Sequence, residues 1–417
     1  MTIQWLRHSI RRFAHLIVIL SESEGSILII LCKAKAEDPK IIIKKSIIMA
    51  GIYVHIPFCK SKCRYCDFAS FPDKINLAES YMACVYREMA KRKQQLENYS
   101  FDTLYIGGGT PSVVDENYIA MLIAAARKNF NLAKDAEITI EINPGTVGAN
   151  KIEVYKKCGI NRFSVGLQTA VDSQLADLGR IHSLKDFLLC AKLLKGENFS
   201  VDVMIGLKNQ TVSDIENTIE IAASSGASHI SMYALTPEDG TPIYTDYLNG
   251  ELPDGDEAAA QYEAGVKKLK SLGFDRYEVS NFCKKGKESR HNLNYWRRGE
   301  YIGFGVSASS CINNVRFTNT FDLDEYFKCI LSDNFAVIDS GEVDGNDREE
   351  EYIMLALRTE RGINLEEYKS LFGNDFTEKY AAQIKKLESA LLCGGGYLKI
   401  KPEKLFVQNG IIVEFFS

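Results

Sequence analysis

Several features are scarce or missing in this sequence of 417 residues, and each absence excludes a class of protein. Apolar runs are short, so no segment reaches the roughly 18–20 residues that a transmembrane helix needs. The net charge of −5 provides no positive field to attract nucleic acid or an anionic membrane. The 11 cysteines are odd in number and scattered, which does not suit a disulfide framework. We therefore expect a cytosolic protein with no nucleic-acid partner.

Residues 1–48 differ from the rest of the chain. They contain early basic residues (Arg7, Arg11 and Arg12) and two short apolar runs separated by a polar stretch. A signal peptide would need a longer apolar region and a small-residue cleavage site, although the acid-free first twenty residues still fit a transit peptide. Met49 directly precedes the first predicted strand, which favours Met49 as the natural start. We predict that 1–48 is a non-native or disordered N-terminal extension.

Three cysteines stand close together after a short apolar run that ends at Ile56. Cys59, Cys63 and Cys66 have C-x3-C-x2-C spacing. An iron–sulfur cluster usually has four cysteine ligands, so three would leave one iron open to a small molecule. A zinc knuckle is the alternative, but the paired C-x2-C layout of many zinc sites is missing here. This loop is the first candidate for chemistry.

From Gly51 onward, β-branched runs alternate with amphipathic segments. The predicted strands are Ile52–Ile56, Thr103–Ile106, Glu137–Ile142, Arg162–Val165, Val201–Ile205, His229–Tyr233 and Tyr277–Val279. Helical segments separate them, the first from Leu77 to about Asn98. Such alternation predicts a parallel sheet with helices outside. Six or so units are too few for a complete eight-unit barrel, so we predict an α/β fold with a partial, open (β/α) barrel over residues 49–280.

The pattern changes after Ser280. Beyond Phe321 the chain reads as helical, and it finishes with two strand-like runs, Tyr397–Ile400 and Ile411–Phe416. Helices followed by a terminal hairpin predict a smaller winged-helix-like α+β domain within residues 281–417.

Polar and glycine residues follow several predicted strands, at the edge where parallel α/β folds bind ligands. The turn Gly107–Pro111 would let a ligand approach the backbone closely, although a tight structural turn fits equally well. Acidic and amide residues could bind ammonium or hydroxyl groups, and an arginine could bind a carboxylate. These residues are Glu141, Gln168, Arg180 and Asp202. Each alone could also be a surface or capping residue.

A second unusual stretch is His291-Asn292-x-x-Tyr295-Trp296. A histidine beside aromatic rings could be an axial haem ligand. A hydrogen-bonded structural histidine is the alternative.

Taken together, these motifs resemble the radical S-adenosylmethionine (radical SAM) superfamily, and within it the coproporphyrinogen-oxidase-like branch with its HemW-like haem chaperones. The resemblance runs from Tyr53 to roughly the C-terminus. The motifs that carry it are Tyr53-x-His55-Ile56-Pro57-Phe58-Cys59, Tyr65-Cys66-Asp67-Phe68, Gly107–Ser112, Glu141-x-Asn143-Pro144-Gly145, Gly166-x-Gln168, Leu178-Gly179-Arg180-x-His182-Ser183, Tyr277–Phe282 and His291–Trp296.

The resemblance implies a [4Fe–4S] cluster on Cys59, Cys63 and Cys66, with S-adenosylmethionine on the open iron. It also implies that a set of matching residues holds the nucleotide and methionine parts. That set is Tyr53, Tyr65, Gly108, Gly109, Thr110, Glu141, Gln168, Arg180 and Asp202. The His291–Trp296 motif would help to bind haem, with His291 as the candidate ligand because Ser309 stands where the family usually has histidine.

Phe68 separates two relatives. The oxygen-independent coproporphyrinogen III dehydrogenases carry a further cysteine at this position, two residues after the third ligand. We therefore expect a haem chaperone that transfers haem to respiratory acceptor proteins, with peripheral association with membrane proteins, and no catalytic residue is assigned. The alternative is a coproporphyrinogen III dehydrogenase or another radical SAM enzyme acting on a tetrapyrrole.

Overall fold

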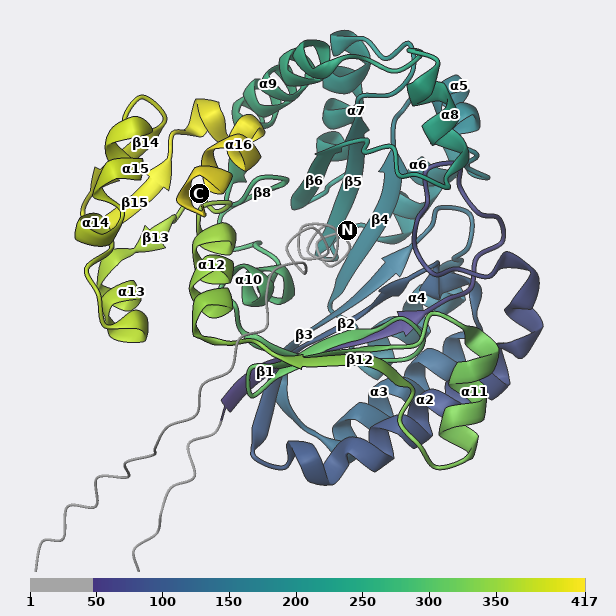
Figure 1. Ribbon diagram of the computed structural model, residues 1–417. Helices are drawn as coiled ribbons and strands as arrows, with labels where there is room; N and C mark the ends of the chain where they lie inside the picture. Colours follow the sequence, from purple (N-terminus) through teal and green to yellow (C-terminus); the bar gives the residue numbers. More distant parts are fainter. Residues whose placement is uncertain (1–47, 417) are drawn as a thin grey trace, which may run out of the picture.

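The computed structural model describes residues 48–416 (Figure 1). Twelve strands form one large sheet and three form a second, small one. The strands of the large sheet are β1 (Ile48–Ile56), β2 (Tyr99–Gly108), β3 (Asn131–Ile142), β4 (Arg162–Gln168), β5 (Phe199–Ile205), β6 (His229–Ala234), β7 (Asp275–Arg276), β8 (Asn281–Cys283), β9 (Glu300–Phe304), β10 (Ser309–Ile312), β11 (Val315–Asn319) and β12 (Val337–Glu342). The helices of this part are α2 (Ala78–Arg92), α3 (Glu116–Asn129), α4 (Ala149–Cys158), α5 (Asp172–Asp177), α6 (Leu184–Leu193), α7 (Val212–Ser224), α8 (Pro242–Leu248), α9 (Gly255–Ser271), α10 (Arg290–Trp296) and α11 (Leu323–Leu331).

The centre of the large sheet is a run of six parallel strands in chain order, β1 to β6. The sheet curves without closing, and its helices cover the outer face (Figure 1). Strand β9 adds parallel to β1, and β10–β12 continue antiparallel beyond it. The α/β class and the open, partial barrel are therefore confirmed. The sheet also continues beyond residue 280, where we predicted the barrel to end.

The two faces of the central strands differ in polarity. In β4, Phe163, Val165 and Leu167 are completely buried under the outer helices, whereas Arg162 and Ser164 line an inner cavity. A strand puts successive side chains on opposite faces, so this alternation follows directly from the sequence R-F-S-V-G-L-Q. Barrel interiors of this kind are usually filled by bulky branched residues. Here small and polar residues leave the lumen hollow.

Helix starts are fixed by side-chain caps. Ser183, Thr211 and Asp254 each accept a hydrogen bond from the third helical residue, whose carboxylate bonds back to the cap. Such reciprocal capping boxes satisfy backbone donors that the first helical turn leaves unpaired. They set where α6, α7 and α9 begin after the loops that follow the strands.

The C-terminal part has its own hydrophobic core and a three-stranded antiparallel sheet, which confirms the predicted smaller α+β domain. Its strands are β13 (Ile363–Asn364), β14 (Leu391–Gly394) and β15 (Tyr397–Ile400), and its helices are α12 (Gly345–Ala356), α13 (Leu365–Phe372), α14 (Phe376–Lys379), α15 (Ala381–Lys386) and α16 (Gln408–Ile412). Five short 3-10 helices complete the described chain: Pro72–Leu77, Lys93–Leu96, Pro111–Val113, Pro402–Val407 and Val413–Phe415.

Three predicted elements are wrong in detail. Ile411–Phe416 is helical rather than extended, because Ile411, Ile412 and Phe415 all reach the C-terminal core from helical positions. Tyr277–Val279 lies between two short strands, β7 and β8, instead of forming one. The long helix is shorter than predicted: α2 starts after Leu77, which makes no side-chain cap, and gives way to a 3-10 turn after Arg92.

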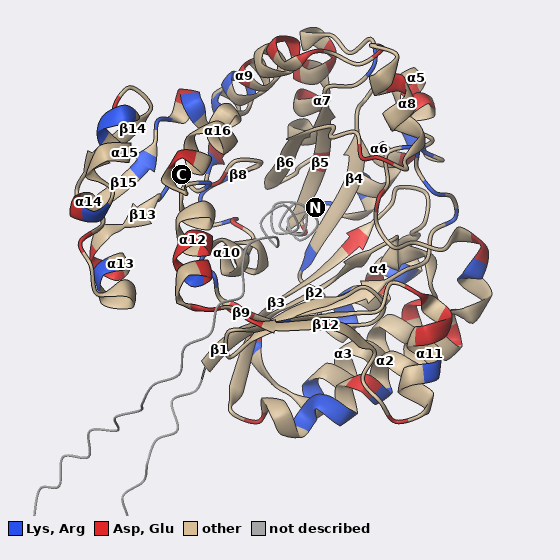
Figure 2. Ribbon diagram, viewed as in Figure 1, with Lys and Arg blue, Asp and Glu red and all other residues tan. Residues whose placement is uncertain are grey.

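Charged residues gather mainly on the outer helices (Figure 2). In the range 48–416, no helix is both long enough and apolar enough to span a bilayer. The predicted N-terminal extension lies outside the described residues except for Ile48, which begins β1.

Candidate cofactor site

The cysteine loop lies at the carboxyl end of β1 and borders a cavity of about 760 Å³. Cys59 is buried, Cys63 and Cys66 are half-buried, and all three line the cavity as free thiols. The loop is tied down at its base, where the Phe71 N–H donates to the Pro57 carbonyl at 2.7 Å. Three soft donors thus border one cavity from a single anchored loop, and their role as cluster ligands stays a prediction.

The thiols are suited to a metal rather than to remaining as free nucleophiles. Burial raises the pKa of Cys59, and it raises that of Cys66 to about 11, with the neighbouring Cys63 adding to both shifts. Metal binding replaces thiol protons, so this crowded, soft donor set fits an iron–sulfur cluster. No group of three or more His, Cys, Asp or Glu between residues 48 and 416 is arranged around a single metal ion.

The glycine turn after β2 packs directly against the cysteine loop. Gly109 N–H donates to the Ile56 carbonyl at 2.8 Å, and a Cβ at Gly109 would lie 2.7 Å from the Phe58 carbonyl and 3.0 Å from Cys59 Sγ. Gly108 has φ +119°, a conformation that side chains disfavour. Contacts within the protein therefore require glycine at both positions, and a role of this turn in ligand binding stays a prediction.

Thr110 and Glu141 complete this side of the site. Thr110 Oγ1 lies 3.5 Å from Cys59 Sγ. Glu141 accepts hydrogen bonds from Tyr105 Oη at 2.9 Å and from the Gly108 N–H at 3.1 Å. Burial raises the pKa of this carboxyl group, and the two hydrogen bonds oppose that rise. The arrangement holds a carboxylate between the glycine turn and the lumen.

Arg180 is the centre of a hydrogen-bond network at the end of the cavity next to the cysteine loop, which we call the mouth of the lumen. It donates from Nε to His182 Nδ1 at 3.4 Å, from Nη1 to Tyr65 Oη at 3.3 Å and Cys63 Sγ at 3.7 Å, and from Nη2 to Asn143 Oδ1 and the Gly166 carbonyl, both at 2.9 Å. All three guanidinium nitrogens are therefore used within the protein. In this structure Arg180 positions the cysteine loop; whether it also receives a ligand carboxylate stays a prediction.

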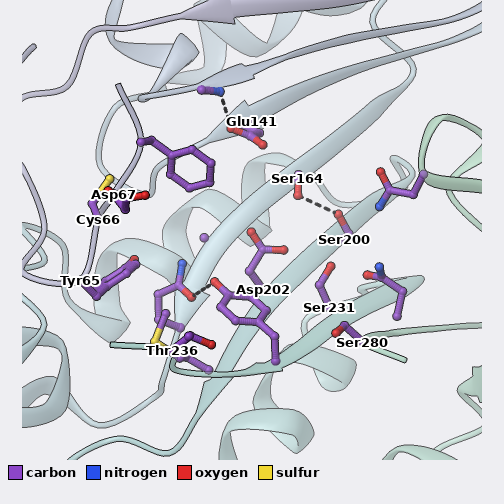
Figure 3. Close-up of a pocket in the computed structure, with 18 of the residues that line it drawn as sticks. Tyr65, Cys66, Asp67, Glu141, Ser164, Ser200, Asp202, Ser231, Thr236 and Ser280 are labelled. Carbon is purple, nitrogen blue, oxygen red and sulfur yellow. Dashed lines mark hydrogen bonds between the residues drawn. The ribbon is translucent and has the colours of Figure 1, made fainter. Parts of the chain in front are cut away.

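Gln168 and Asp202 lie on neighbouring strands and line the same cavity. Gln168 has φ +73°, unusual for a residue other than glycine, and its Oε1 accepts from Tyr233 Oη at 2.7 Å. Burial raises the pKa of Asp202, and a hydrogen bond from Ser231 opposes the shift. Figure 3 shows Asp202 directed into the cavity, with Glu141 and Tyr65 at its rim.

Tyr53 and His291 lie deeper than the mouth. Tyr53 Oη is 3.1 Å from His55 Nδ1, and its ring stacks on Tyr105. His291 is 2 % exposed, with Nδ1 2.8 Å from Thr103 Oγ1 and Nε2 2.9 Å from Tyr295 Oη. Burial lowers the pKa of His291 to about 3, so the ring is neutral at ordinary pH. In this conformation both ring nitrogens are occupied, as expected of a hydrogen-bonded structural histidine.

Sequence reasoning missed the inner rows of the barrel. Tyr105, Arg162, Ser164, Ser200, His229, Ser231 and Tyr233 all line the cavity. Ser200 donates to Ser164 at 3.1 Å across β4 and β5 (Figure 3). The sequence does contain a signal for these rows. Buried parallel strands are normally continuous apolar runs, whereas in these strands apolar and polar residues alternate.

Comparisons with known proteins match most of this chain to known families. The model of the radical SAM superfamily matches residues 53–222, and that of the HemN C-terminal domain matches residues 343–407. Heme chaperone HemW of Bacillus subtilis is 33% identical over 345 residues, which cover 81% of this chain and 91% of that protein. Heme chaperone HemW of Escherichia coli is 37% identical over 266 residues, 62% of this chain and 69% of that protein.

A solved structure has the same fold. Coproporphyrinogen III oxidase (HemN) from Escherichia coli, described as a radical SAM enzyme, superposes with a TM-score of 0.78 over 90% of this chain and 91% of that chain. Its sequence identity is 18%, so this likeness shows the fold alone.

Proposed function

The chain belongs to the radical SAM superfamily, in the family of proteins named heme chaperone HemW, and from this premise we propose that it binds haem and transfers it to acceptor proteins. The observation that supports this most strongly is the 33% identity across 91% of the Bacillus subtilis protein of that name. Respiratory proteins, some of them in membranes, are the acceptors we propose.

We further propose that Cys59, Cys63 and Cys66 hold a [4Fe–4S] cluster that binds S-adenosylmethionine at its fourth iron. Such a cluster, when reduced, supplies an electron that can cleave the sulfonium of S-adenosylmethionine. The protein's own residues support the site in three ways. Arg180 fixes Cys63 and Tyr65 in place. Gly108 and Gly109 allow the turn to pack against the cysteine loop, and Glu141 and Asp202 can accept hydrogen bonds from ammonium or hydroxyl groups.

His291 is our proposed haem ligand, and the structure sets a condition for that role. Because Tyr295 occupies Nε2 and Thr103 occupies Nδ1, one of these hydrogen bonds must open before an iron can bind. The ring is already neutral, which is the form that coordinates metal.

We also propose a cellular compartment for this protein, from the state of its cysteines. The cysteines at described positions are all free, including the buried Cys84, Cys190 and Cys283. Free thiols persist in reducing compartments, so we propose a cytosolic location.

An enzyme acting on a tetrapyrrole is the second candidate, because the fold matches that of coproporphyrinogen III oxidase. Phe68 argues against this candidate, since it stands where the resemblance leads us to expect a further cysteine in those enzymes. An anaerobic assay with a reductant, S-adenosylmethionine and coproporphyrinogen III distinguishes the two. Formation of protoporphyrinogen IX would establish the enzyme.

Haem titration of the full chain, with its cluster reconstituted, tests the chaperone directly. We expect one haem per chain with a saturable change in the haem spectrum. The matched pair of variants is His291→Ala, expected to lose the ligated spectrum, and His182→Ala, which removes a buried histidine that does not line the cavity and is expected to keep it. Failure of the wild-type protein to bind haem, with or without the cluster, would overturn the proposal.

A further inference from the structure

The floor of the lumen carries an arginine that nothing in the proposed cofactor site uses. Arg162 begins β4, so it lies at the opposite end of the strand from the mouth where the cysteine loop lies. Its side chain comes from the inner row that also contains Ser164 and Gln168, and it lines the same cavity. The site at the mouth and this floor are therefore two ends of one lumen.

Arg162 is buried with part of its guanidinium group unpaired. The residue is 3% exposed, its Nη1 has no hydrogen-bond acceptor, and no carboxylate of the described residues forms an ion pair with it. Arginine is almost never fully buried unless it is paired, because removing an unpaired charge from water is costly. A group that the protein itself does not supply would remove this cost.

A second unpaired donor lies nearby. His229 begins β6 and lines the cavity, its Nε2 is 2.8 Å from Tyr277 Oη, and its Nδ1 has no partner. Tyr277 Oη accepts from the Ser289 N–H at 3.2 Å, so its own proton is left to donate to Nε2. That assignment puts the histidine proton on Nδ1. Burial and then the charge of Arg162 lower the pKa of His229, so the ring stays neutral.

Neither Asp202 nor Glu278 forms an ion pair with Arg162, although the charge of Arg162 opposes the rise in the pKa of Asp202. Asp202 stands farther along β5, in register with Gly166, and accepts a hydrogen bond from Ser231. Glu278 accepts from the Ser280 N–H at 3.1 Å, and burial raises its pKa to about 7, so it is about half protonated at pH 7 and mostly protonated below that pH. The floor therefore presents a fixed positive charge and a neutral N–H donor.

We propose that the floor of the lumen is a carboxylate-binding site, in which Arg162 and His229 bind a carboxylate of a small molecule that enters the cavity. A planar guanidinium binds the two oxygens of a carboxylate with charge-assisted hydrogen bonds. A propionate side chain of haem is one source of this group, and in that form the inference rests on the proposed function. A free organic acid is the other source.

Comparing the affinities of the full chain for haem and for haem dimethyl ester tests whether a propionate is the group that binds. We expect the wild-type protein to bind the ester about 10-fold to 100-fold more weakly than haem, because the ester cannot form a charge-assisted hydrogen bond with Arg162. Arg162→Met should weaken haem binding by the same factor and should no longer distinguish haem from the ester. Arg127→Met, which removes an exposed arginine of α3, should change neither affinity. Equal affinity of the wild-type protein for haem and ester, with citrate failing to compete with haem, would overturn the site.

Thermal unfolding tests the site even when no haem binds. Without ligand, Arg162→Met removes a buried charge that has no ion-pair partner among the described residues, so we expect the melting temperature to rise by about 2 °C or more. Citrate, as the carboxylate probe, should then stabilise the wild-type protein and not the variant. If the wild-type protein binds citrate at Arg162 but not haem, the proposed function fails and the carboxylate site stands. If Arg162→Met lowers the melting temperature and citrate has no effect on either protein, the site is wrong.

Discussion

Two arginines line the same cavity in opposite circumstances. Arg180, at the mouth of the lumen, donates from all three guanidinium nitrogens to groups of the protein. Arg162, on the floor, is more deeply buried and leaves Nη1 without an acceptor. The hydrogen bonds of Arg180 at the mouth are therefore complete without a ligand. Arg162 on the floor has a free donor, and a ligand could supply the hydrogen-bond acceptor for it.

This difference assigns the two ends of the lumen to different tasks. A preorganised mouth suits a resident cofactor, since its ligands are held in place by the surrounding residues. The floor, where Arg162 has no ion-pair partner, suits a ligand that binds reversibly, because the buried charge lowers the stability of the protein until the ligand is bound. The predictions below test that contrast, from the largest expected effect to the smallest.

The largest effect concerns the cysteines at the mouth. We expect Cys59→Ala, Cys63→Ala and Cys66→Ala each to lose nearly all cluster iron, since no described side chain replaces the missing thiolate. Iron and sulfide analysis after reconstitution measures the loss. Cys190→Ala, which removes a buried thiol of α6 away from the cavity, should retain the cluster. Full iron content in the three loop variants would mean that the mouth is not a metal site.

The next effect is a difference of sign between the two arginines. Arg180→Met leaves Asn143 Oδ1 and the Gly166 carbonyl without their donor, so we expect a loss of about 3–5 kcal/mol in the free energy of unfolding. Arg180→Lys should recover only part of it, because a lysine cannot reach all of these acceptors at once. Chemical denaturation measures both. A stabilising Arg180→Met would remove the distinction between mouth and floor.

A third prediction uses pH to examine the floor. Burial raises the pKa of Glu278 from 4.5 to about 7, so between these values the native protein binds more protons than the unfolded chain. The free energy of unfolding should therefore fall as pH rises through this window, by at most about 3 kcal/mol, and this contribution should be constant above it. Glu278→Gln should remove that slope. Denaturant titrations at pH 4.5 to 8 check it, and an unchanged slope in the variant would assign the titration to another group.

The smallest predicted effect concerns His291. Tyr295→Phe removes the hydroxyl that occupies Nε2, so the stability should fall by about 1 kcal/mol. If His291 binds haem through Nε2, the same change should strengthen haem binding severalfold, because no hydrogen bond to Tyr295 has to be broken before Nε2 can bind the iron. Parallel unfolding and haem titrations measure both quantities. Weaker haem binding in Tyr295→Phe would contradict this view of the ligand.

Much of the mouth could be predicted from the sequence because its groups are local. Cys59, Cys63 and Cys66 lie in one loop, and the glycine turn follows the next strand, so spacing alone places these groups near one another. Glu141 could be placed by the rule that ligands bind at the carboxyl ends of parallel strands. The open barrel followed from the count of strand–helix units.

The floor could not be predicted in the same way. Arg162 and His229 stand at the amino ends of strands far apart in sequence, where no motif marks them, and their lack of partners appears only when the surrounding side chains are known. Ile411–Phe416 shows a similar limit: its β-branched, aromatic composition favours a strand, yet packing on the C-terminal core makes it helical. The occupation of both nitrogens of His291 likewise depends on Thr103, 188 positions away.

The central claim is that this protein carries haem and gives it up to an acceptor. The most direct measurement loads the cluster-containing full chain with haem, mixes it with a haem-free b-type cytochrome and follows the cytochrome spectrum. We predict transfer at a rate faster than from free haem buffered by serum albumin, and no transfer from His291→Ala. Haem that stays bound to the wild-type protein, or that reaches the cytochrome no faster than from albumin, would contradict the account.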